Sequence, residues 1–73
     1  MPVTTLNVAD VFTYHAPTPE QIIALGAVRE SAKGLANVLL ANVPQSADQQ
    51  AAIRLLREAV MTANAGIVLN GAV

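Results

Sequence analysis

The sequence contains no cysteine and no tryptophan, and its only aromatic residues are Phe12 and Tyr14. Without cysteine there is no disulfide framework, no thiolate zinc site and no cysteine nucleophile. Charged residues are also scarce, at 12% of the chain, and four Lys and Arg against five Asp and Glu leave a formal net charge of -1. This balance argues against a DNA or RNA polymer as partner, because binding to a phosphate backbone depends on clustered lysine and arginine.

Long hydrophobic runs are absent as well. The longest uninterrupted apolar stretches, such as Val38 to Ala41, fall far short of the roughly 18 residues that a membrane-spanning helix needs. The N-terminus also lacks the basic start and continuous apolar core of a signal peptide. The sequence therefore predicts a soluble, cytosolic protein without a membrane partner.

Apolar residues are nevertheless abundant for so short a chain. They make up 53% of 73 residues, a content too high for a disordered protein. A chain of this length forms one small domain, and folding alone buries only about 60% of its unfolded surface. No disulfide staples the fold. We therefore expect the chain to cover its apolar surface against copies of itself, as a homo-oligomer.

The first long helix is predicted over about residues 18–42. Thr18 is a good N-cap, Pro19 suits the first helical position, and Gln21 completes a capping box of the T-x-x-Q form. Pro44 cannot continue a helix and favours extended geometry in the residue before it. Apolar residues at alternating steps of three and four form the stripe of one helix face: Leu25, Val28, Ala32, Leu35 and Leu39.

The second long helix is predicted over about residues 46–69 and starts in the same way. Ser46 and Gln49 form a second capping box, and Asn70 with Gly71 supplies a stop signal. Its apolar stripe has the same three- and four-residue steps: Ile53, Leu56, Val60, Ala63 and Ile67.

These elements predict an all-α fold with an antiparallel two-helix hairpin, because a short link between helices gives antiparallel neighbours. Residues 1–17 form a short N-terminal arm, and residues 18–70 form the hairpin domain. Within the arm, residues 8–12 suit either one helical turn or a short extended piece, and the sequence leaves both open. We expect the hairpins to assemble into a homo-oligomeric helical bundle.

Glycines occur inside both predicted helices, at Gly26, Gly34 and Gly66. A glycine in a helix interior costs about 1 kcal/mol relative to alanine. Their presence predicts close packing against another element at these positions.

Catalysis has little support in the sequence. His15 is the one histidine, and the acidic residues nearest to it are Asp10 and Glu20. No H-E-x-x-H, D-x-D, P-loop or G-x-G-x-x-G pattern is present, and no serine or threonine lies in a nucleophile elbow. We expect a protein that is not an enzyme and that uses no cofactor and no metal.

A few polar residues form a pattern that suits a nucleotide. Tyr14 and His15 lie just before the first long helix, and Arg29 and Lys33 share one face of that helix at a spacing of four. An aromatic ring stacks on a nucleobase, while cations bind its phosphates. Ser31 adds a hydroxyl nearby, so these five residues are the candidate ligand site.

Each of these residues also has a plainer interpretation, which spacing alone leaves open. Tyr14 suits an anchor that packs the arm onto the hairpin, and His15 suits an exposed position in the leader. The two cations flanked by Glu30 suit a solvated helix face.

Plainer interpretations also apply to the second helix. Arg54, Arg57 and Glu58 suit a solvated face, and Arg54 and Glu58 suit an ordinary i,i+4 ion pair. Asn64 suits a side chain that satisfies a neighbouring helix.

Two blocks of sequence carry a family resemblance. The entry Phe12-Thr-Tyr-His-Ala-Pro-Thr-Pro-Glu-Gln is followed by Ala27-Val-Arg-Glu-Ser, and after Val43-Pro-Gln-Ser and Asp48-Gln-Gln comes Leu56-Arg-Glu-Ala-Val-Met-Thr-Ala-Asn-Ala. In this order and separation they resemble the hairpin domain shared by phage anti-CBASS and Thoeris anti-defence sponge proteins. The resemblance covers roughly residues 12–70.

The resemblance implies sequestration without cleavage. Members of this family form homo-oligomers, typically hexamers, and bind the cyclic nucleotide messengers of bacterial immunity so that the effector is not triggered. In similar proteins an aromatic residue before the first helix stacks on the bases of a cyclic dinucleotide, and a later cation meets the phosphates. Tyr14 and Arg29 have that separation here, and Ser31 stands at the place of a nearby hydroxyl residue. The cytoplasm of the infected bacterial host is the implied location.

The chain also departs from the family pattern. Some members carry a late arginine that serves a second pocket for cyclic trinucleotides, whereas this chain has no Arg or Lys after Arg57. Thr62 stands where many relatives have a tryptophan. The alternatives to a sponge are a structural or adaptor hairpin that binds only protein, and a phosphodiesterase-like enzyme that destroys the messenger.

Overall fold

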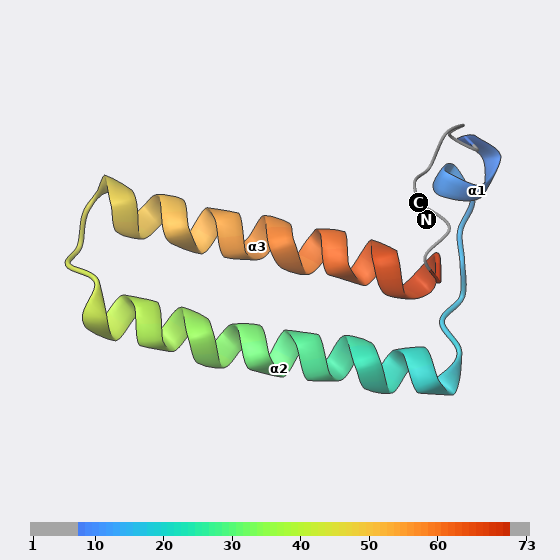
Figure 1. The fold of residues 1–73 in the computed structure, drawn as a ribbon, viewed down its shortest axis with the longest axis horizontal. Helices are drawn as coiled ribbons and strands as arrows, with labels where there is room; N and C mark the ends of the chain where they lie inside the picture. The colour runs from blue at the N-terminus through green and yellow to red at the C-terminus, as the bar shows by residue number, and fades with distance from the viewer. Residues whose placement is uncertain (1–7, 71–73) are drawn as a thin grey trace.

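The computed structural model describes residues 8–70, which contain three helices and no strand (Figure 1). Helix α1 spans Val8–Phe12, α2 spans Pro19–Asn42 and α3 spans Ala47–Val68. Helices α2 and α3 lie side by side and antiparallel, and α1 lies beyond the open end of this hairpin (Figure 1). The predicted all-α hairpin is therefore confirmed, and the open choice at residues 8–12 is settled in favour of a helix. Residues 1–7 of the predicted arm and Gly71 of the predicted stop signal lie outside the described residues.

The start of α2 is held by the predicted capping box. The Thr18 hydroxyl accepts a hydrogen bond from the backbone N–H of Gln21 at 3.2 Å, and the Gln21 side-chain oxygen accepts from the backbone N–H of Thr18 at 2.9 Å. The helix ends where Val43 adopts extended geometry (φ -95°, ψ 125°) before Pro44. Local interactions therefore set both ends of α2, as the sequence predicts.

The second predicted capping box is wrong in one half. The Ser46 hydroxyl does accept from the backbone N–H of Gln49 at 3.1 Å, but the Gln49 side-chain amide donates instead to the Val43 carbonyl at 3.0 Å. Gln49 is only 6% exposed. The chain reverses after Val43, which brings the Val43 carbonyl within reach of the first turn of α3. A backbone carbonyl there needs a hydrogen-bond donor. The Gln49 side chain therefore holds the link between α2 and α3 through Val43 and does not complete the capping box of α3.

Helix α3 ends at the predicted stop. The backbone N–H of Leu69 donates to the Ala65 carbonyl at 2.9 Å, and Asn70 adopts a left-handed conformation with φ 52°. Asparagine is one of the few non-glycine residues that tolerates this region at a helix C-terminus.

The two apolar stripes meet along one seam, yet no apolar side chain in the described region is fully buried. Of the predicted stripe residues, all those in α3 and all but Leu35 in α2 are half-buried. The apolar residues that lie off the seam face solvent, with Ile23 at 74% and Leu55 at 60% exposure. The radius of gyration of 15.1 Å exceeds the about 11 Å expected of a compact chain of this length. One pair of helices offers one contact surface, so the rest of the apolar surface stays open.

The helix glycines Gly26, Gly34 and Gly66 do not pack closely against another helix of the described residues. A Cβ built on Gly34 or Gly66 meets nothing within 4 Å, and one on Gly26 meets only the Arg29 guanidinium at 3.7 Å. The expectation of close packing is therefore wrong within a single hairpin, because these positions lie off its one seam.

Gln21 also joins the two helices at the open end of the hairpin, a role that the sequence did not predict. Its side-chain amide donates to the Ile67 carbonyl at 3.0 Å, which belongs to the last turn of α3. Helix ends leave such carbonyls without a partner inside the helix, and the Gln21 amide is a second donor to this one beside the backbone N–H of Asn70 at 3.2 Å. One side chain therefore caps the start of α2 and holds the end of α3.

Gln21→Ala is expected to lower the free energy of unfolding by about 1–2 kcal/mol, because it removes the side-chain half of the cap and the bond to Ile67. Urea unfolding at one fixed protein concentration measures this change. Gln50→Ala is the matched control, since Gln50 is exposed in the first turns of α3 and makes one long side-chain contact of 3.5 Å. Equal losses in the two variants would contradict the assigned role of Gln21.

No helix within residues 8–70 is both long and apolar enough to cross a membrane.

Candidate functional site

Two open grooves run along the hairpin, on opposite sides of the α2–α3 seam. The first, called the apolar groove, has a volume of about 450 Å³; the second, called the cationic groove, has a volume of about 280 Å³. Ala32, Leu56 and Val60 line both, because they stand in the seam that separates them. The remaining lining residues differ in chemistry, so the two sides of the hairpin suit different occupants.

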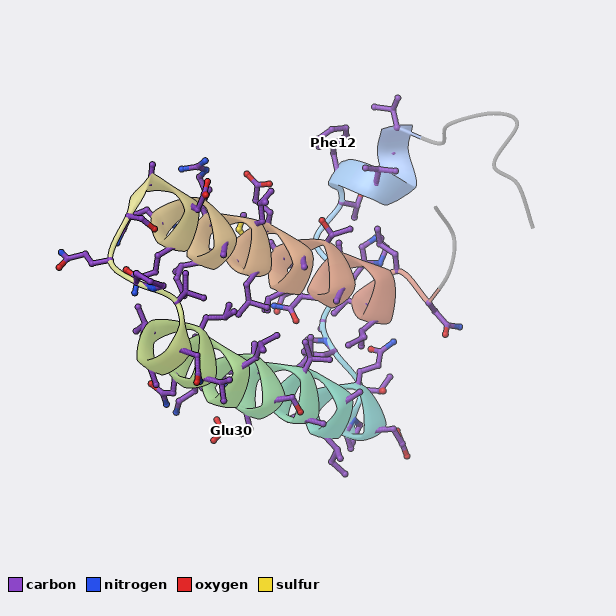
Figure 2. The ribbon with its side chains drawn as sticks, turned by 60° about the vertical axis from the view of Figure 1, so that its left-hand side comes forward. Phe12 and Glu30 are labelled. Carbon is purple, nitrogen blue, oxygen red and sulfur yellow. The ribbon has the colours of Figure 1, made fainter. Side chains whose placement is uncertain are left out.

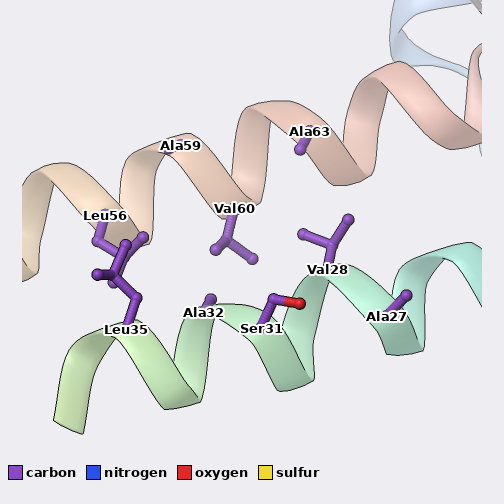
Figure 3. Close-up of a pocket in the computed structure, with 9 residues that line it drawn as sticks. All are labelled: Ala27, Val28, Ser31, Ala32, Leu35, Leu56, Ala59, Val60 and Ala63. Carbon is purple, nitrogen blue, oxygen red and sulfur yellow. The ribbon is translucent and has the colours of Figure 1, made fainter. Parts of the chain in front are cut away.

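Small side chains line the apolar groove (Figure 3). Ala27 and Ser31 face it from α2, and Ala59 and Ala63 face it from α3. Small side chains leave the backbones of α2 and α3 open to close approach. Another helix could therefore pack along this side of the hairpin. Its full lining is Ala27, Val28, Ser31, Ala32, Leu35, Leu56, Ala59, Val60 and Ala63.

Three of the four cations of the chain line the cationic groove. Arg29 and Lys33 come from α2, and Arg57 comes from α3. The floor between them is apolar and consists of Ala32, Ala36, Ile53, Leu56, Val60 and Met61. An apolar floor with cations at its edges suits a ligand that combines flat, weakly polar rings with phosphate groups.

The cations from α2 are only weakly engaged within the chain. Arg29 lies 3.9 Å and Lys33 3.5 Å from the same carboxylate oxygen of Glu30, and all three side chains are about two-thirds exposed. Exposed pairs of this kind contribute little to stability. Figure 2 shows Glu30 projecting from α2 away from α3. Both cations therefore remain available to an incoming phosphate.

Tyr14 stands apart from both grooves. It lies in the extended segment between α1 and α2 and is 84% exposed. The interpretation of Tyr14 as an anchor that packs the arm onto the hairpin is wrong in this structure. His15 is half-buried, so the interpretation as an exposed leader residue is wrong as well.

One hairpin does not bring the five candidate residues to a common point. Arg29 lies about 15 Å along α2 from Pro19, the first residue of the helix. The segment with Tyr14 and His15 joins α2 at Pro19 and passes the C-terminal end of α3 (Figure 1). Arg29 and Ser31, two positions apart, project to opposite sides of the helix and line different grooves. The structure brings Arg29 and Lys33 together and leaves Tyr14, His15 and Ser31 elsewhere.

Arg57 is the groove residue that sequence reasoning missed. Its spacing also suits a solvated face with Arg54 and Glu58. The predicted ion pair between Arg54 and Glu58 is not formed, and Arg57 makes no ion pair with any of the described residues. Arg57 reaches the cationic groove because it follows Leu56, which stands in the seam. A signal was present in the sequence, since a residue next to a stripe position lies at the edge of the contact surface.

Asn64 leaves one acceptor without a partner. Its side-chain oxygen Oδ1 is shielded from solvent and accepts no hydrogen bond from any residue in the described part. The interpretation that Asn64 satisfies a neighbouring helix does not account for this oxygen. A shielded acceptor without a donor costs about 1–3 kcal/mol, so another molecule that supplied a donor here would stabilise the fold.

Within the described part of the chain, no three His, Asp or Glu side chains gather in a way that could hold a metal ion.

Comparison with known proteins gives one match. The family model described as "Acb2/Tad1, hairpin domain" matches residues 5–68, which include α1, α2 and α3. The comparisons found no curated protein and no solved structure that matches the chain.

Proposed function

Because the chain belongs to the Acb2/Tad1 hairpin-domain family, the family of anti-CBASS and anti-Thoeris sponges, we propose that it sequesters cyclic nucleotide immune messengers without cleaving them. Cyclic dinucleotides are the first candidates, followed by cyclic trinucleotides and cyclic ADP-ribose isomers. The protein acts in the cytoplasm of an infected bacterial host, where it keeps the messenger from its effector.

The observation that carries this proposal is the cationic groove. Arg29 and Lys33 stand beside an apolar floor, which is the combination that a nucleotide needs. Arg29 offers a planar guanidinium that can bind a phosphate through two parallel hydrogen bonds. Lys33 adds a mobile point charge. These groups bind phosphate strongly because a hydrogen bond between two charged partners is about twice as strong as a neutral one.

The groove also supports binding over catalysis. The lining of the groove holds no carboxylate, hydroxyl or imidazole group, and its three cations suit the binding of phosphate. Its cations stabilise negative charge. A sponge needs only this, together with abundance and an affinity higher than that of the host receptor.

Self-association is the second part of the proposal, with a hexamer as the expected assembly. The exposed apolar residues, the small-residue apolar groove, and the helix glycines without close neighbours all support a partner hairpin on this surface. A homo-oligomer also explains the separated site residues. Tyr14 of one protomer can meet Arg29 of another, with His15 and Ser31 nearby.

The ligand itself favours such a shared site. A cyclic dinucleotide has two bases and two phosphates related by two-fold symmetry, and a two-fold protein interface repeats each residue once. Two Tyr14 rings then stack on two bases, and two Arg29 side chains meet two phosphates. Assembly concentrates positive charge locally, so a chain with net charge -1 binds a dianion.

A protein-only adaptor is the alternative, favoured by the large exposed apolar surface. Titration calorimetry with cyclic dinucleotides, cyclic trinucleotides and cyclic ADP-ribose isomers separates the two functions. A sponge binds at least one member with a Kd below about 10 μM, which corresponds to a binding free energy of roughly -7 kcal/mol. Binding of none of them at this level would reject the sponge and leave the adaptor.

A further inference from the structure

We propose that Arg57 is a third phosphate-binding cation of the nucleotide site, contributed by α3 from across the seam. The inference rests on the proposed function and adds to it a residue of the second helix. Its occupant is a cyclic dinucleotide, whose rings lie over the apolar floor of the cationic groove.

The geometry places cations on both edges of one groove. Arg29 and Lys33 stand on the α2 edge, and Arg57 stands on the α3 edge, with Leu56 and Val60 in the seam between them. Neighbouring helix axes lie about 8–10 Å apart, so long arginine side chains on the two edges reach a common small molecule. The two phosphates of a cyclic dinucleotide lie on opposite sides of its ring. Cations on both edges of the groove can therefore bind phosphate oxygens of the same ligand.

The charge of the groove matches the same ligand. Both α2 cations share the carboxylate of Glu30, at 3.9 Å from Arg29 and 3.5 Å from Lys33. Arg57 has no ion pair among the described residues. Arg57 therefore adds a cation that no carboxylate of the described residues pairs with, to two cations that share one exposed carboxylate.

The floor of the groove suits flat rings. Met61 is part of this floor and is 59% exposed. A thioether is polarisable and makes favourable contacts with aromatic rings. The α3 side of the groove therefore offers both parts of a nucleotide site, a cation for phosphate and a soft apolar surface for a base.

Arg57 has a matched control three positions earlier. Arg54 is exposed on the same helix and does not line the cationic groove. Arg57→Gln and Arg54→Gln remove the same charge, keep a polar side chain of similar helix propensity, and differ only in their place relative to the groove. Any effect of net charge on the whole molecule is therefore common to both variants.

The experiment is titration calorimetry of the wild-type protein, Arg57→Gln, Arg54→Gln and Arg57→Lys with the cyclic dinucleotide that binds best, at several salt concentrations. We expect Arg57→Gln to raise the Kd at least about tenfold, the effect of losing one charge-assisted hydrogen bond, and to make the affinity less dependent on salt. Arg54→Gln is expected to change the Kd by less than about twofold. Arg57→Lys keeps the charge and recovers most of the salt dependence.

Each other outcome overturns the inference in a distinguishable way. Wild-type affinity in Arg57→Gln removes Arg57 from the site and leaves the proposed function standing. Equal losses in the two Gln variants show a general charge effect and no role in the groove. Failure of the wild-type protein to bind any cyclic dinucleotide rejects the inference, and calorimetry with the other messenger classes then decides whether the proposed function falls too. Light scattering on each variant shows that its molar mass is unchanged.

Discussion

Replacing Tyr14 by alanine is expected to weaken the binding of a cyclic dinucleotide at least about 30-fold, while leaving the oligomer intact. The Tyr14 ring is 84% exposed and makes no packing contribution whose loss would unfold the hairpin. Stacking of a base on an aromatic ring contributes about 1–3 kcal/mol per base. A two-fold site stacks two bases, so even the low end gives about 2 kcal/mol, which corresponds to a factor of about 30.

Two control variants accompany Tyr14→Ala in the same titrations. Tyr14→Phe keeps the ring and is expected to bind with nearly wild-type affinity. Phe12→Ala removes the other aromatic residue of the chain, which is 79% exposed on α1 and projects away from the hairpin (Figure 2), and it is expected to have little effect. Wild-type affinity in Tyr14→Ala would show that the aromatic part of the site lies elsewhere.

Ala59→Glu is expected to dissociate the oligomer into protomers of 7.6 kDa. Ala59 is exposed and lines the apolar groove, so a single hairpin accommodates the longer side chain in solvent. When another helix covers this groove, the carboxylate loses its water, and an unpaired buried charge costs several kcal/mol. The same cost recurs at every copy of the interface. We expect Ala59→Glu to weaken nucleotide binding as well, because the proposed site draws on more than one protomer.

Sedimentation equilibrium at micromolar concentration measures this effect, and circular dichroism shows that the helices remain. Asn37→Glu is the matched control, since Asn37 is exposed on α2 and lines neither groove. The wild-type protein and Asn37→Glu are expected to sediment as the same multiple of 7.6 kDa. A wild-type protein that is a stable monomer, or an Ala59→Glu variant with wild-type mass, would contradict the proposed interface.

Features that depend on neighbours within one helical turn were predictable from the sequence. The capping box of Thr18 and Gln21 and the extended Val43 before Pro44 follow from groups three or four positions apart, or directly adjacent. The seam was predictable too, because helical periodicity assigns each stripe residue to one face.

Features that depend on the second helix were not predictable in this way. The side-chain amide of Gln49 closes the link, and that of Gln21 reaches the Ile67 carbonyl. Both bonds exist only because the chain reverses and brings distant backbone groups near. Spacing along one helix gives no information on which carbonyl of another helix will lie within reach.

The candidate site shows the same division. Spacing correctly paired Arg29 with Lys33, but Arg57 joins them only through the alignment of α3 against α2. The expected close packing at Gly34 and Gly66 is not met within one hairpin, because a sequence does not distinguish contacts inside a chain from contacts between copies. For the same reason, the meeting of Tyr14 with Arg29 remains a prediction about the assembly.

The most direct test of sequestration is recovery of the ligand. The protein is equilibrated with a limiting amount of a cyclic dinucleotide and filtered, and the retained protein is then denatured by heat. Mass spectrometry identifies the nucleotide in the filtrate and in the heated fraction. Sequestration predicts that the filtrate is depleted in proportion to the protein added, and that heating releases the intact cyclic dinucleotide. A filtrate that keeps all the ligand, or a heated fraction that contains linear or cleaved nucleotide, would contradict it.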